Sequence, residues 1–109
     1  PGRAATPAAR ARKAVRAIFA DPADASALAA RLHIDEGAGP SAPDALAAID
    51  RALDLASWEA AGADRRILQD RVAARIRADY AADRFDRHGG IYLTRIERDL
   101  CAAAAGAGV

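Results

Sequence analysis

The segment SAPDALAAIDRALDLASWEAAG, residues 41–62, decides the fold because it combines a helix start with a long apolar pattern. Ser41 precedes Asp44 by three residues, which resembles the capping box at the beginning of a helix. Apolar side chains then recur at steps of three and four residues, as one face of a helix requires. These residues are Leu46, Ile49, Leu53 and Ala56. The pattern predicts a helix that starts after Ser41 and ends near Gly62.

Two large apolar residues of this segment, Leu55 and Trp58, lie off that face. They widen the apolar surface of the predicted helix beyond a single stripe. A helix that contacts two neighbouring helices needs such a surface, and so does a helix that binds a partner. The sequence leaves both interpretations open.

Upstream of this segment, the sequence predicts two more helices. Residues 8–20 carry Val15, Ile18 and Phe19 at helical spacing. A second helix is expected to begin at Asp21 and Pro22, an N-cap followed by proline at the first helical position. Its apolar residues are Leu28 and Leu32, and the loop DEGAGPSAP, residues 35–43, separates it from the central segment.

Downstream, the sequence predicts a long helix from Asp64 to about Asp86. Its apolar stripe has a residue at every fourth position: Leu68, Val72, Ile76 and Tyr80. Arginine and aspartate alternate on the other face, and Arg75 lies four residues before Asp79. Such pairs stabilise an exposed helix surface. We therefore expect this charged face to be solvated and internally neutralised.

The stretch DRHGGIYLTRIERDLC, residues 86–101, contains the residue types of an active site, but their order along the chain is typical of a connection between two helices. Glycines after His88 are typical of a helix end. Residues 91–93 are expected to be extended but too few for a sheet. Thr94 and Glu97 then form the spacing of a capping box, and a last helix follows with Ile96 and Leu100 facing inward.

These elements together predict an all-α protein, a compact bundle of four to five helices in a single domain. Residues 1–7 are interpreted as an irregular leader, residues 8–105 as the bundle and residues 106–109 as a flexible tail. The predicted core comprises Leu28, Leu32, Leu46, Ile49, Leu53, Leu68, Val72, Ile76, Tyr80, Ile96 and Leu100.

Composition excludes several classes of protein. The 16 basic and 15 acidic residues give a net charge of +1, so no global field attracts nucleic acid or anionic membrane. A single cysteine excludes an intramolecular disulfide, and no apolar run approaches the length of a membrane span. A cytoplasmic location is the default expectation. The absence of methionine and the alanine- and arginine-rich composition suggest a domain excised from a larger bacterial protein.

Catalytic and metal-binding interpretations lack supporting patterns. Cys101 with His88 and an aspartate, Asp86 or Asp99, offers the residue types of thiol catalysis, but Cys101 adjoins the apolar face of its helix. The two histidines, His33 and His88, stand in separate elements without a helical ligand spacing. We expect no enzymatic activity, cofactor or metal.

Two classes of binding function remain. The first is a non-enzymatic protein-interaction or targeting module, because apolar and aromatic residues in excess of one core stripe are typical interface anchors. The candidate contact residues are Leu55, Trp58, Phe85, His88 and Tyr92.

The alternative is a module that binds anionic surfaces, either acidic lipid head groups or nucleic acid. The N-terminal segment is the one local excess of positive charge, since no acidic residue precedes Asp21. The candidate anion-binding residues are Arg3, Arg10, Arg12, Lys13 and Arg16.

Overall fold

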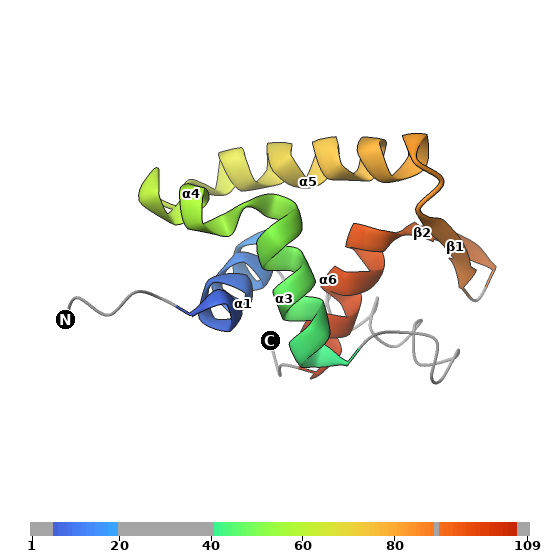
Figure 1. The fold of residues 1–109 in the computed structure, drawn as a ribbon, viewed down its shortest axis with the longest axis horizontal. Coiled ribbons are helices and arrows are strands. Elements are labelled where there is room, and N and C mark those ends of the chain that lie inside the picture. The colour runs from blue at the N-terminus through green and yellow to red at the C-terminus, as the bar shows by residue number, and fades with distance from the viewer. Residues whose placement is uncertain (1–5, 20–40, 89, 107–109) are drawn as a thin grey trace.

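A computed structural model describes residues 6–19, 41–88 and 90–106 of the chain (Figure 1). This part is mostly helical, which confirms the predicted small all-α bundle. Its elements are α1 (Pro7–Ile18), α3 (Ala42–Leu53), α4 (Leu55–Ala60), α5 (Arg65–Ala81), β1 (Phe85–His88), β2 (Ile91–Thr94) and α6 (Arg95–Gly106). The predicted helix that begins at Asp21, with Leu28 and Leu32, lies outside the described residues.

The central helix of the arrangement is α3, which packs against α6 and α1. Helix α5 crosses the ends of α3 and α6, and the β-hairpin lies beyond its C-terminal end (Figure 1). The core lies between these helices. Six of the residues assigned to the core from the sequence are buried: Leu46, Ile49, Leu53, Leu68, Ile96 and Leu100.

The helix predicted for residues 41–62 is interrupted at Asp54, so it forms two helices, α3 and α4. Ser41 caps α3 as expected, since its Oγ accepts a hydrogen bond from the Asp44 amide at 3.3 Å. Asp54 has φ 48° and ψ 58°, a left-handed conformation that ends α3 and starts α4. This turn redirects the chain and places Leu55 and Trp58, 0% and 1% exposed, in the core.

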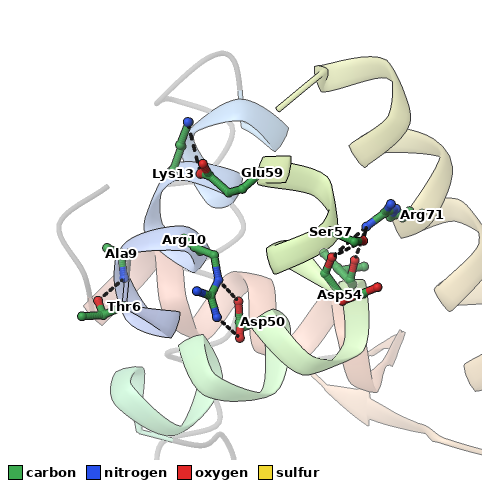
Figure 2. Close-up of polar contacts among 10 residues, drawn as sticks. Thr6, Ala9, Arg10, Lys13, Asp50, Asp54, Ser57, Glu59 and Arg71 are labelled. Atoms are coloured by element: carbon green, nitrogen blue, oxygen red, sulfur yellow. Dashed lines mark hydrogen bonds and ion pairs between the residues drawn. The ribbon is translucent and has the colours of Figure 1, made fainter. Parts of the chain in front are cut away.

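Arg71 of α5 binds the backbone at this break (Figure 2). Its Nη1 donates to the carbonyl oxygens of Leu53 and Asp54 at 2.9 and 2.8 Å and to Oγ of Ser57 at 2.9 Å. The Ser57 hydroxyl in turn donates to the Asp54 carbonyl at 2.9 Å. The Asp54 carbonyl also accepts from the Trp58 amide at 3.3 Å, as within a helix, whereas the Leu53 carbonyl at the end of α3 is satisfied by a side chain of another helix.

The predicted long helix ends earlier than expected, and its last residues form a strand. Helix α5 stops at Ala81, Asp83 takes a positive φ of 58°, and β1 pairs with β2 in an antiparallel hairpin. The expectation that residues 91–93 are too few for a sheet was therefore wrong. Residues 85–88 supply the partner strand, and Gly90 has the positive φ of 88° that the connection between the strands requires.

The capping box at the start of α6 is confirmed. The Thr94 amide donates to Oε1 of Glu97 at 3.1 Å, and the Glu97 amide donates to Oγ1 of Thr94 at 3.4 Å. Helix α6 continues to Gly106, and its Ala103 and Ala104 are buried. Small side chains at these positions allow α6 to pack closely in the bundle.

The charged face of α5 is not uniformly solvated, because Asp79 is fully buried. Its Oδ1 accepts from Nε of Arg84 at 2.8 Å and pairs with Nε of Arg75 at 3.2 Å. Its Oδ2 accepts from the backbone amide of Ile96 at 2.9 Å. The expected Arg75–Asp79 pair is present, but its carboxylate is a buried link between α5, the start of the hairpin and the first turn of α6.

We expect Asp79→Ala to lower the free energy of unfolding by about 1–3 kcal/mol, because it leaves the buried amide of Ile96 without its acceptor. Urea denaturation followed by circular dichroism measures this change. Asp70→Ala, at an exposed position of the same helix, is the control and should change stability by less than about 0.5 kcal/mol. Equal stability of the two variants would contradict the role given to Asp79.

Candidate functional site

Three aromatic rings gather where α5 meets the hairpin. The ring centroids of Tyr80 and Phe85 are 5.2 Å apart, and those of Phe85 and Tyr92 are 5.9 Å apart. Tyr80 and Tyr92 are 44% and 59% exposed, whereas Phe85 is partly buried between them. We call these three residues the aromatic surface.

The hairpin register brings Phe85 and Tyr92 together. Phe85 pairs with Thr94, and Arg87 pairs with Tyr92, so the two aromatic residues are diagonal neighbours on one face. Their rings meet edge to face, a favoured geometry for an aromatic pair. These two predicted contact residues therefore lie in one site.

The sequence placed Tyr80 in the core, and the structure corrects this. A helix turns about 100° per residue, so a stripe of residues four apart rotates by about 40° at each step. Along α5, Leu68 is buried, Val72 and Ile76 are partly buried, and Tyr80 is exposed. The strict spacing of four was the signal in the sequence that this stripe leaves the core.

The other predicted contact residues are placed differently. Leu55 and Trp58 are buried, so they belong to the core and not to a contact surface. The Trp58 indole donates to the Asp64 carbonyl at 2.7 Å, and Nζ of Lys13 lies 5.9 Å from its ring centroid. The hydrogen bond satisfies the indole N–H that an exposed tryptophan would offer to a partner. His88 lies in β1, opposite Ile91.

The predicted anion-binding face of α1 is partly neutralised within the fold (Figure 2). Arg10 binds the Asp50 carboxylate through Nε at 2.9 Å and Nη2 at 3.1 Å, and this hydrogen bonding raises the pKa of Arg10. Nζ of Lys13 pairs with Oε1 of Glu59 at 3.1 Å. Arg12 and Arg16 remain exposed on α1, and Arg3 lies outside the described residues.

Cys101 is buried on α6, with 3% of its surface exposed. Burial, together with the negative charge of Glu97, raises the pKa of its thiol to about 11. A thiol with a raised pKa is a poor nucleophile at neutral pH, whereas catalytic cysteines have lowered pKa values. The described residues contain no cluster of three or more metal-ligating side chains.

Comparison of the chain with protein-family models, curated proteins and solved structures gives no match. No helix in the described part of the chain combines the length and apolar character of a membrane span.

We expect native Cys101 to react with iodoacetamide at least about 100-fold more slowly at pH 7 than the same thiol in urea. With a pKa of about 11 the thiolate fraction is roughly one in ten thousand, whereas an unperturbed thiol with a pKa of about 8.5 is about 3% thiolate. Mass spectrometry of the single cysteine gives both rates. Equal rates would contradict the burial and raised pKa of Cys101, and a faster rate in the native protein would show an activated thiol.

Proposed function

We propose that this protein is a non-enzymatic helical module for protein interaction or targeting, and that the aromatic surface contacts its partner. The observation that supports this best is the exposure of two tyrosines, 44% and 59%, around a partly buried phenylalanine. Tyrosine is enriched at protein interfaces because its ring contributes a large apolar area and its hydroxyl a hydrogen bond.

Contacts within the protein hold the aromatic surface in place before a partner binds. Phe85 contacts both tyrosine rings, so less side-chain entropy is lost when a partner binds. Asp79, through Arg84 and the Ile96 amide, ties α5 to both ends of the hairpin. Arg87 is exposed opposite Tyr92 and adds a positive charge at the rim. A matching partner would offer an apolar depression bordered by a carboxylate.

We expect a photo-crosslinking amino acid at position 92 to capture one protein partner in cells, whereas the same amino acid at position 67 captures none. Ile67 is a matched control, because it is also an exposed apolar residue and lies near the other end of α5. Mass spectrometry identifies the captured protein. Binding of the purified partner should then weaken by at least about 30-fold in Tyr92→Ala, as for an interface hot spot.

Two outcomes would contradict the proposal. Capture of the same proteins at positions 67 and 92 would indicate nonspecific contact. An identified partner that binds Tyr80→Ala and Tyr92→Ala as tightly as the unchanged chain would show that the aromatic surface is not the contact.

The alternative function, binding to anionic surfaces, is supported by a smaller set of residues than the sequence suggested. Arg12 and Arg16 are exposed and four residues apart on α1, so both side chains project from one face of the helix. Arg10 and Lys13 are held by Asp50 and Glu59. Two cations on one helix favour at most a weak, salt-dependent association with phosphates.

If this alternative holds, affinity for duplex DNA should fall with salt with a log–log slope near −2, since each phosphate contact contributes about −0.9. Fluorescence anisotropy across a salt series measures the slope. Arg12→Ala with Arg16→Ala should abolish the binding, and Arg66→Ala with Arg77→Ala, on exposed positions of α5, is the matched control. Vesicles containing acidic lipid test the lipid form of the alternative in the same buffers.

A further inference from the structure

A pocket of about 280 Å³ lies between α3, α5 and α6, apart from the aromatic surface. One arginine from each helix lines it: Arg51, Arg75 and Arg95. Ala48 and Ala52 of α3 also line the pocket, and their small side chains leave room beside the guanidinium groups. The pocket volume is at the lower limit of small-molecule sites, so it suits a compact ligand.

The residues that line this pocket carry more positive than negative charge. Asp99 is the only acidic residue among the described residues that line it. This carboxyl is buried and lies 3.4 Å from Nη2 of Arg98, which does not line the pocket. The three arginines therefore exceed the single carboxyl of the wall by two positive charges.

The three arginines differ in whether they already form ion pairs within the protein. Arg75 pairs with Asp79, whose Oδ1 also binds Arg84. Within the described part of the chain, Arg51 and Arg95 make no ion pair, and both residues are exposed. Two guanidinium groups from different helices are thus available at the opening of the pocket.

We propose that this pocket binds a small oxyanion with two negative charges, such as phosphate or the phosphate group of a small phosphomonoester. Guanidinium groups present paired N–H donors that match the oxygens of phosphate. Arg51 and Arg95, which make no ion pair within the described residues, supply the positive charge that attracts the dianion. This site is independent of the proposed protein contact, since the pocket includes no residue of the aromatic surface.

The Asp99 carboxyl does not prevent anion binding. Burial raises the pKa of Asp99, the largest effect on this group, while Arg98 and Arg95 oppose the shift. A raised pKa makes it less costly for the carboxyl to take up a proton when an anion approaches.

Titration of the ¹⁵N-labelled full chain with inorganic phosphate, followed by NMR, tests the site directly. We expect saturable shifts at amides of residues around the pocket, and at least a tenfold weaker affinity in Arg51→Ala and in Arg95→Ala. Both side chains are exposed, so these variants should retain the fold, which circular dichroism verifies. Arg77→Ala removes an exposed arginine of α5 that does not line the pocket and should bind phosphate unchanged.

Chloride at matched ionic strength separates binding from general screening, and phenyl phosphate tests whether a phosphomonoester fits. Shifts that do not saturate, or that chloride reproduces, would overturn the proposal. Equal affinities of Arg51→Ala, Arg95→Ala and Arg77→Ala would overturn it as well. Saturable phosphate binding without binding of phenyl phosphate would restrict the ligand to the free ion.

Discussion

The break at Asp54 is the constraint on which the rest of the bundle depends. A left-handed conformation is unfavourable for most side chains, and aspartate is among the few that adopt it singly. Arg71 compensates by binding the carbonyls of Leu53 and Asp54 from another helix. The break is therefore a tertiary feature, because the residue that stabilises it lies 17 positions away from Asp54.

Because of this break, the core includes large apolar residues that do not belong to the apolar stripe of α3. Leu55 and Trp58 turn inward after Asp54, and Trp58 meets Lys13 of α1. Glu59, next to Trp58, pairs with the same lysine. Nearly a third of the chain is alanine, so the chain has few large apolar residues. Burial of two of them, Leu55 and Trp58, therefore contributes substantially to a core of this size.

The sequence predicted correctly those features of the fold that depend on residues only a few positions apart in the chain. The caps at Ser41 and Thr94 form as their spacing indicates. The long helix begins after Asp64, as expected, and the Asp64 side chain caps it. The hairpin was missed because its two strands are recognisable only as a pair, and residues 85–88 resembled a helix end.

The basic face of α1 was overestimated because Asp50 and Glu59, which neutralise part of it, lie about 40 or more residues further along the chain. Two of the three residues of the aromatic surface, Phe85 and Tyr92, were identified from the sequence, whereas Tyr80 was assigned to the core because the rotation of the α5 stripe was not followed.

Asp79 connects the two proposed sites. Its carboxylate binds Arg75, which lines the pocket, and Arg84, which precedes the strand that carries Phe85. An anion that attracts Arg75 would weaken one of the three contacts of Asp79, while Arg84 and the Ile96 amide would keep the other two. The hairpin would therefore stay attached, and any coupling between anion and protein partner would be small. Because such coupling is reciprocal, its size could be read from either ligand.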